Sequence, residues 1–450
     1  MFKRSILVDL EKWRKKDARK PLVIRGARQV GKTTVIKEFG KKFEQFIYLN
    51  LELAEDRQPF EQFRNAETLL QTIFFLKNKS ISKKAESLLF IDEIQAMPEA
   101  LNQLRYINEQ APELAVVAAG SMLESLFGKN AAFPVGRVEY KVLRPVSFAE
   151  FLSALGETAA LEQLTQVPVN QFAHQKLLSL FHTYAVIGGM PEVVQHYTNH
   201  KDLTALSTLY DSLLASYIDD VEEYAKSDVQ AQILRHAIRS CFSLAGKRIK
   251  FQGFGNSNYG SREIGEVLRS LQKALLIHLV YPDTRYTLPL HPDVKKSPRL
   301  HVLDTGLMNY FVGIQKEILN TRDLSKVFQG TMVEHLVGQE LLTIQFEALS
   351  GLHFWVREKT TSAAELDYLL PFESKLIPIE VKSGSSGKLR SLHMFMDQVP
   401  HQIAIRLYAG QVELSQVRTP NGKEFMLLDL PYYAVSQITR YLEWVKAQGM

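Results

Sequence analysis

The feature that most constrains this chain is a glycine-rich loop between a short apolar run and a helix-forming segment. The apolar run covers residues 22–24, and the loop after it fits the pattern G-x-x-x-x-G-K-S/T. Glycines at both ends let backbone N–H groups turn toward a phosphate, and the following helix adds its positive dipole end. The loop therefore predicts nucleotide binding. The residues expected at the nucleotide are Gly26, Ala27, Arg28, Gln29, Val30, Gly31, Lys32, Thr33 and Thr34.

A second motif supplies the acids that such a loop needs. Four apolar residues at 88–91 run into Asp92 and Glu93, as expected of a buried parallel strand whose acidic end emerges beside the loop. We expect Lys32 to reach the β- and γ-phosphates, and Thr33 and Asp92 to hold Mg²⁺. Glu93 is placed to polarise the attacking water, so Glu93 and Lys32 are the predicted catalytic pair. ATP and Mg²⁺ are the expected cofactors.

Two further strands carry polar residues with alternative roles. Ser121 follows the apolar run 114–119, where its hydroxyl would either sense the γ-phosphate or cap a helix at 122–127. A strand at 138–143 is flanked by Arg137 and Arg144. Either arginine is a candidate arginine finger, and a surface salt bridge is the alternative for both.

The order of these segments favours one branch of phosphate-loop proteins. A β-rich run at 46–51 separates the loop strand from the acidic strand, and helices are expected at 34–39, closed by Gly40, and at 59–78. This arrangement resembles the AAA-type ATPases with a catalytic glutamate. The resemblance implies a parallel sheet of strand order 5-1-4-3-2.

The middle of the chain is predicted to be mostly helical. Residues 148–214 have helical spacing, broken at 186–192 by Gly188, Gly189 and Pro191, and they resemble the helical lid of AAA-type proteins. Helices at 228–244 and 261–273, with a ribbon of 274–280 and 286–288, resemble a winged helix. The second helix bears basic residues for DNA contact and acidic ones that oppose it, so a packing role is the alternative. These residues are Arg262, Arg269, Lys273, Glu263 and Glu266.

The last quarter holds a second acidic constellation. A helix at 330–346 carries Glu334, a strand-like stretch at 365–370 carries Asp367, and the alternation of residues 377–382 puts Glu380 and Lys382 on one face. This arrangement resembles the PD-(D/E)xK nucleases. The resemblance implies Mg²⁺ at Glu334, Asp367 and Glu380, with Lys382 assisting the hydrolytic water. The alternative is a surface ion pair between Glu380 and Lys382. A helix at 388–396 is expected to pack on this sheet.

Length and composition bound the remaining possibilities. The 450 residues suggest two to four domains, which we place at 1–147, 148–225, 226–315 and 325–450. Cys241 is the only cysteine, which excludes an intramolecular disulfide and an all-cysteine zinc site. The net charge of +5 permits nucleic-acid binding, and the basic residues 1–20 form either such a contact or a solvated helical face. The absence of a signal peptide and of a membrane-length apolar run predicts a cytoplasmic protein without a membrane partner.

Taken together, the motifs at 26–33, 88–93, 188–191 and 379–384 resemble a family of prokaryotic predicted ATPases. Its members join an AAA-type domain to a C-terminal domain of unknown function with a restriction-endonuclease-like core. The resemblance implies an α/β multidomain fold that binds ATP. Two functions follow as hypotheses: an ATP-dependent nuclease acting on DNA, or an ATP-driven switch whose C-terminal domain binds a partner or nucleic acid without cutting. A second copy of the chain is a further candidate partner.

Overall fold

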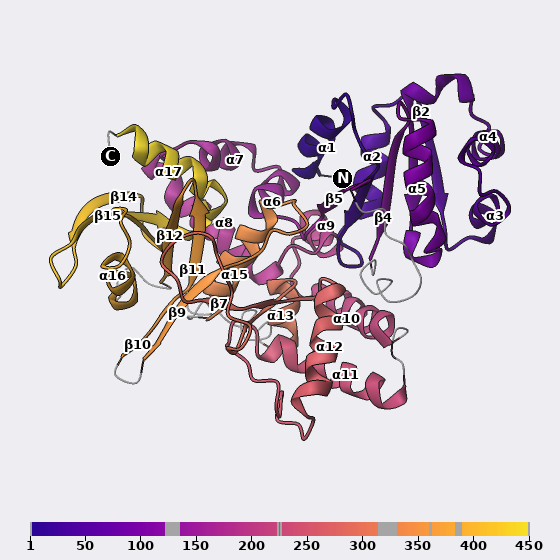
Figure 1. Ribbon diagram of the computed structural model, residues 1–450. Coiled ribbons are helices and arrows are strands. Elements are labelled where there is room, and N and C mark those ends of the chain that lie inside the picture. Colours follow the sequence, from indigo (N-terminus) through magenta and orange to yellow (C-terminus); the bar gives the residue numbers. More distant parts are fainter. Residues whose placement is uncertain are drawn as a thin grey trace.

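The two largest sheets of the protein have five strands each and are joined through helices and two smaller sheets. The computed structural model describes residues 2–121, 136–222, 225, 227–313, 331–359, 362–382 and 389–448. One sheet lies in the N-terminal part of the chain and the other in the C-terminal part, at opposite ends of the molecule, with most of the middle helices between and below them (Figure 1). No helix in these ranges is both long enough and apolar enough to cross a membrane.

The N-terminal sheet is parallel and has the strand order β2-β3-β4-β1-β5, which confirms the predicted order 5-1-4-3-2. Strands β3 and β4 are buried along their whole length because helices cover both faces. Helices α1 (Ile6–Arg14) and α2 (Lys32–Gly40) pack on one face, and α4 (Ala66–Leu76) and α5 (Glu99–Gln110) on the other. The strands are β1 (Leu22–Arg25), β2 (Gln45–Asn50), β3 (Ser87–Asp92), β4 (Ala115–Gly120) and β5 (Glu139–Val142).

Two helix predictions in this domain need correction. The single helix expected at 59–78 is two helices, α3 (Ala54–Gln62) and α4, because the Asn65 side chain accepts hydrogen bonds from the backbone N–H groups of Glu67 and Thr68 and caps a new helix. Gly40 is the last residue of α2 and does not lie beyond its end. A Cβ at Gly40 would lie 2.4 Å from the Phe46 ring, so close packing explains this glycine.

Five helices follow, and they confirm the predicted break. Helix α8 ends at Ile187, Gly188 has a φ of 75°, and α9 begins at Pro191. Residues 122–135 lie outside the described ranges, and with them the possible helix at 122–127. The five helices are α6 (Phe148–Leu155), α7 (Thr158–Thr165), α8 (His174–Ile187), α9 (Pro191–His200) and α10 (Leu206–Glu222).

The predicted winged-helix ribbon is wrong in its pairing. After α11 (Asp228–Ser243) and α12 (Ser261–Lys273), strand β6 (Ile277–Val280) pairs with β8 (Arg299–Val302) and not with residues 286–288. Tyr286 packs against Trp355 and Phe395 of the C-terminal region, with ring centroids 5.5 Å apart in each case. These long-range contacts take the segment away from β6. Helix α13 (Thr305–Phe311) follows β8.

The C-terminal region forms a mixed five-stranded sheet of order β11-β12-β13-β15-β14, in which β12, β13 and β15 are parallel. The strand expected at 365–370 is interrupted at Asp367, which separates β10 from β11. Strand β7 (Pro282–Asp283) of the middle region joins β9 and β10 in a three-stranded sheet. The elements are α15 (Thr331–Thr343), β9 (Phe354–Lys359), β10 (Ser362–Leu366), β11 (Tyr368–Phe372), β12 (Lys375–Val381), α16 (Arg390–Met396), β13 (Ile403–Tyr408), β14 (Glu413–Arg418), β15 (Glu424–Pro431) and α17 (Ile438–Ala447).

One hydrophobic core runs through all four predicted domains. It includes Ile24 of β1, Phe148 of α6, Leu268 of α12, Ile405 of β13 and Tyr441 of α17. Because buried apolar contacts cross each predicted boundary, a displacement in one region is opposed by packing in the next. The two five-stranded sheets are thus linked by continuous apolar packing.

Candidate functional site

The glycine-rich loop turns sharply between β1 and α2. Gly31 has a φ of 94° and Gln29 a φ of 63°, both in the left-handed region. A Cβ at Gly26 would lie 2.5 Å from the backbone oxygen of Leu143, so only glycine fits between the loop and the end of β5. The two glycines of the motif are thus required by the backbone itself, as the sequence pattern predicts.

Lys32 lies at the start of α2 and folds back over the loop. Its Nζ donates hydrogen bonds to the backbone oxygens of Gly26 and Ala27, at 3.0 and 2.9 Å. Burial lowers the pKa of Lys32 to about 8, although Glu93 and Asp92 act in the opposite direction. A buried ammonium held by carbonyl oxygens is ready to exchange them for phosphate oxygens, which carry full charge.

Thr33 and Asp92 meet at the end of β3. The Thr33 Oγ1 donates a hydrogen bond to Asp92 Oδ2 at 2.7 Å, and the Tyr48 hydroxyl donates to the same oxygen at 3.3 Å. Burial raises the pKa of Asp92, although the Thr33 hydrogen bond lowers it. A hydroxyl and a carboxylate side by side are the oxygen ligands that Mg²⁺ prefers, so these two residues fit the predicted ion.

Glu93 lies beside Lys32 on the wall of a cavity of about 540 Å³. Its backbone is left-handed, with a φ of 50°, and the Gln95 side-chain amide donates a hydrogen bond to Glu93 Oε2 at 2.5 Å. A non-glycine residue in this conformation carries strain, which is common at functional sites. Gln95 therefore fixes the orientation of the carboxylate.

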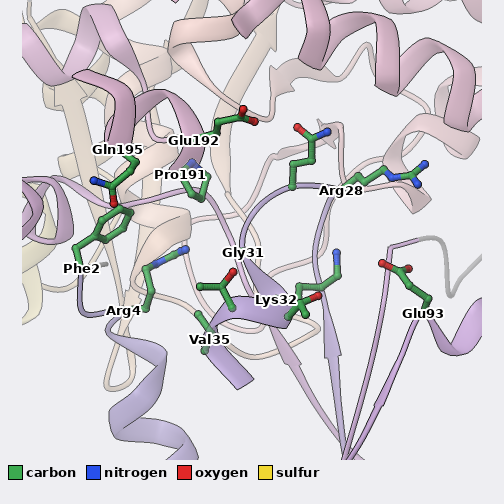
Figure 2. A pocket seen from close by; sticks show the side chains of 13 residues that line it. Phe2, Arg4, Arg28, Gly31, Lys32, Val35, Glu93, Pro191, Glu192 and Gln195 are labelled. Atoms are coloured by element: carbon green, nitrogen blue, oxygen red, sulfur yellow. The ribbon is translucent and has the colours of Figure 1, made fainter. Parts of the chain in front are cut away.

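The cavity is closed on its far side by residues that the sequence analysis did not identify. Figure 2 shows Lys32 and Glu93 on one side of it and the N-terminal segment and α9 on the other. A volume of this size is typical of sites for small molecules. The sequence signals for these residues were the glycine-rich turn before Pro191 and, for Arg4, the basic stretch at 1–20. The missed residues are Phe2, Arg4, Pro191, Glu192 and Gln195.

Two arginines tie the loop to its surroundings. The buried Arg4 donates to the backbone oxygen of Val30 at 2.9 Å and pairs with Glu150 of α6 at 3.0 Å. Arg28, a predicted nucleotide contact, lines the cavity and pairs with Asp220 of α10 at 2.7 Å. The loop is thus held from both the N-terminal segment and the helices that follow the sheet.

Three predicted polar residues lie off the cavity. Ser121 is buried just after β4 and is not among the residues that line it. Arg137 is exposed and pairs with Glu109 at 2.9 Å, which is the salt bridge considered as its alternative. Arg144 is buried and lies 3.1 Å from His278 Nε2, and burial lowers its pKa to about 10.

The glycine pair between α8 and α9 contacts a distant acid. The Gly189 N–H donates to Asp304 Oδ2 at 2.5 Å, and Asp304 Oδ1 accepts from the Leu307 N–H at 3.0 Å and caps α13. A Cβ at Gly188 would lie 2.3 Å from Asp304 Oδ1, and one at Gly189 would lie 2.3 Å from the Val146 oxygen. Both glycines are required by close approach.

The acids predicted in the last quarter do come together, and we call Glu334, Glu365, Asp367 and Glu380 the acidic cluster. Asp367 Oδ2 accepts a hydrogen bond from the Val381 N–H at 2.7 Å, next to Glu380. Lys382 Nζ pairs with Glu380 Oε1 at 2.5 Å, as in the predicted ion pair.

The sequence analysis did not identify Glu365 as a member of this cluster, nor Arg299 of β8 as its partner. Arg299 pairs with Glu334 and Glu365 and donates to the Asp367 backbone oxygen at 2.8 Å. Burial raises the pKa of Glu334, Asp367 and Glu380, and repulsion from other members of the acidic cluster, Glu365 among them, adds to it. In the described ranges, no group of three or more His, Cys, Asp or Glu side chains is arranged to hold a metal ion. As arranged here, the acidic cluster does not fit the predicted Mg²⁺.

Comparison with protein families divides the chain into three parts. Residues 18–152 match the model of an AAA domain. Residues 178–318 and 329–426 match two domains of unknown function, DUF8612 and DUF4143. No curated protein matches the chain. With the strand order of its sheet, the first match shows that the N-terminal domain is an ATPase-type P-loop domain of the AAA class.

Solved structures show remote similarity. A Walker-type ATPase of Pyrococcus abyssi is 13% identical, covering 69% of this chain and 96% of its own, with a TM-score of 0.43. The ORC1 protein of Aeropyrum pernix, solved in complex with DNA, is 12% identical, covering 70% of this chain and 92% of its own, with a TM-score of 0.26. DnaA of Aquifex aeolicus, bound to AMPPCP, is 11% identical, covering 59% of this chain and 86% of its own, with a TM-score of 0.24. TM-scores of this size do not establish a common overall fold.

Proposed function

We propose that the protein binds and hydrolyses ATP with Mg²⁺ and couples its nucleotide state to the C-terminal domain. The observation that carries the ATPase proposal is the hydrogen bond between Thr33 and Asp92 beside the cavity that Lys32 and Glu93 line. Mg²⁺, when bound, neutralises phosphate charge. Lys32 then holds the β- and γ-phosphates, and Glu93 accepts the proton of the attacking water.

The coupling proposal rests on the contact between Gly189 and Asp304. Gly189 lies two residues before Pro191, which lines the nucleotide cavity, and Asp304 lies five residues after Arg299, which pairs with the acidic cluster. A movement of α9 on nucleotide binding would therefore act on the segment that carries Arg299. In this scheme helices α6–α10 act as the helical lid, and the ion pair between Arg28 and Asp220 supports that role as one closing contact.

DNA is the proposed target of the C-terminal domain. The domain either cleaves the DNA as a nuclease, or it acts as a switch that binds a partner or nucleic acid without cleavage. A nuclease would use Lys382 with the acids, and the strand sequence β11–β12–α16–β13 is compatible with a nuclease-like domain. The pairing of Arg299 and Lys382 with those acids favours the second candidate, a switch that binds a partner or nucleic acid without cutting. DNA contact through α12 has less support, because Arg262 pairs with Glu266 on the same helix.

A DNA cleavage assay with Mg²⁺ or Mn²⁺, with and without ATP, separates the two candidates. For the nuclease, cleavage of single- or double-stranded DNA disappears in Lys382→Ala and loses its ATP dependence in Lys32→Ala. If wild type and Lys382→Ala are equally inert, the nuclease proposal is rejected. For the switch, nucleotide-dependent binding persists in Glu380→Ala and is lost in Lys32→Ala, and its loss in both variants speaks against that candidate.

A further inference from the structure

The cation at the centre of the acidic cluster comes from outside the C-terminal region. Arg299 lies at the start of β8, more than thirty residues before α15, and only 5% of it is exposed. Its Nη1 pairs with Glu334 and also donates to the Asp367 oxygen, and its Nη2 pairs with Glu365. A guanidinium in this position neutralises acids that would otherwise repel one another.

The guanidinium is held on its faces as well as its edges. Its central carbon lies 4.4 Å from the centre of the Phe354 ring and 6.0 Å from that of Tyr368. Burial tends to lower the pKa of Arg299, but Glu334 and its neighbours outweigh burial and the net shift is upward. Arg299 is therefore a permanent charge in a site shaped to its planar form.

Two oxygens of the acidic cluster, Glu334 Oε1 and Glu380 Oε2, are buried without a hydrogen bond, and Arg299 forms an ion pair with the first of them. Glu380 is 7% exposed, and while its Oε1 pairs with Lys382, its Oε2 is buried without a hydrogen bond. A buried carboxylate oxygen left in this state is costly and calls for a cation or a donor. The nearby Glu334, which is needed to complete a predicted metal site, is engaged by Arg299. The buried guanidinium holds positive charge beside these carboxylates, and a small, hard dication that approached Glu334 would be repelled by it.

We propose that Arg299 is a built-in cation of the acidic cluster, and that a divalent cation binds Glu334, Asp367 and Glu380 only when Arg299 leaves. The inference deepens the proposed function of the C-terminal domain and rests on it for the identity of that site. In the arrangement described here the cluster is closed to metal. The ion pair between Arg299 and Glu334 is thus an autoinhibitory contact that decides whether the domain binds metal.

Titration of the full chain with Mn²⁺, followed by calorimetry or by the EPR signal of free Mn²⁺, tests the proposal. In the absence of nucleotide, Arg299→Gln is expected to gain one equivalent of Mn²⁺, with affinity higher than in wild type on the order of tenfold or more. Adding Asp367→Asn and Glu380→Gln to that variant is expected to remove the gained equivalent. Arg248→Gln is the matched control, because Arg248 pairs with Glu358 and approaches Glu365 but not Glu334.

Three results overturn the proposal. In the first, wild type binds the additional equivalent of Mn²⁺ as tightly as Arg299→Gln does. In the second, Arg299→Gln gains no Mn²⁺. In the third, the Mn²⁺ gained by Arg299→Gln is still bound after Asp367→Asn and Glu380→Gln are added. If Arg299→Gln does not fold, Arg299→Gln with Glu334→Gln removes both partners and keeps Asp367 and Glu380. That double variant is expected to gain a weaker, Asp367-dependent Mn²⁺ site, and its failure to do so also rejects the proposal.

Failure of the inference and failure of the proposed function give different results. Mn²⁺ binding by Arg299→Gln does not require Lys32, so it persists when Lys32→Ala is added. If ATP never opens the site in wild type although Arg299→Gln binds Mn²⁺, the coupling is wrong and the closed cluster is right. If Arg299→Gln gains no Mn²⁺ while ATP changes DNA binding by wild type, the closed cluster is wrong and the coupling is right.

Discussion

Thr33 and Asp92 are joined by a hydrogen bond of 2.7 Å, although 59 residues separate them in the chain. Thr33 is the second residue of α2, the helix after the glycine-rich loop, and Asp92 ends β3, which lies two strands away from β1 in the sheet. The parallel order β3-β4-β1 brings the carboxyl ends of both strands to one edge. This single contact places the hydroxyl and the carboxylate of the proposed Mg²⁺ site beside Lys32.

We expect Lys32→Ala to weaken ATP binding by about 10- to 100-fold, because a buried charge-assisted contact to phosphate is lost. Fluorescent-nucleotide titration measures the affinity. Lys41→Ala is the matched control, since Lys41 is exposed beyond the same helix and pairs only with Glu38 in the described contacts. Equal losses in the two variants would contradict the assignment of Lys32.

We expect Glu93→Gln to bind ATP as wild type does and to lose about a hundredfold to ten-thousandfold in kcat, because Mg²⁺ ligands remain while the water loses its base. Phosphate release under saturating ATP measures this. The exposed Glu99→Gln on the neighbouring helix is expected to leave kcat unchanged. Undiminished turnover in Glu93→Gln would show that another group acts as the base.

We expect Gly189→Ala to destabilise the fold by about 1–3 kcal/mol, the usual cost of overpacking. Its Cβ would lie 2.3 Å from the Val146 oxygen and would displace the turn that Asp304 holds. Urea unfolding measures the change. Gly351→Ala, whose Cβ would meet no atom within 4 Å, is expected to be nearly neutral. A neutral result for Gly189→Ala would mean that the turn yields without cost.

The pH dependence of stability should carry a contribution from Asp304. Burial raises its pKa to about 6, against about 3.9 for an exposed Asp, so the folded chain holds this proton more tightly than the unfolded chain. Ionisation of Asp304 therefore opposes folding. Its contribution to the free energy of unfolding should fall by about 2–3 kcal/mol as pH rises from about 4 to 6, and stay constant above that range.

Comparison of wild type with Asp304→Asn isolates this contribution from that of the other buried acids. The difference in free energy of unfolding, wild type minus variant, should decrease between about pH 4 and pH 6 and then level off. Urea titrations across that range give the curve. Parallel pH profiles for the two proteins would show that Asp304 is not held protonated by burial.

Local patterns were sufficient for the phosphate loop and the acids beside it. The motif at Gly26 and Lys32, the apolar run before Asp92 and the break at Gly188 each depend on a few consecutive residues, and the structure has them where the pattern predicts. The strand order was implied by the resemblance to AAA-type ATPases, which rested on the additional strand between the two motifs, and the sheet confirms it. The prediction of a single helix at 59–78 was wrong because Asn65, a residue that favours helix N-caps, begins a second helix there.

The remaining features depend on contacts between residues far apart in the chain. Phe2 and Gln195 line the same cavity although they lie far apart in the chain. Tyr286 packs against Trp355 and not in the predicted ribbon. No periodicity or spacing records such a pairing, because side-chain packing between distant elements decides it.

The sequence by itself determined which chemistry is available: a phosphate loop with its acids, and a second group of acids with Lys382 near the other end. Only the tertiary structure decided how that chemistry is arranged. It brought Arg299 from the middle region onto Glu334, and Asp304 onto the turn before α9. The physical reason is that a buried charge must find a partner in three dimensions, wherever the chain supplies one.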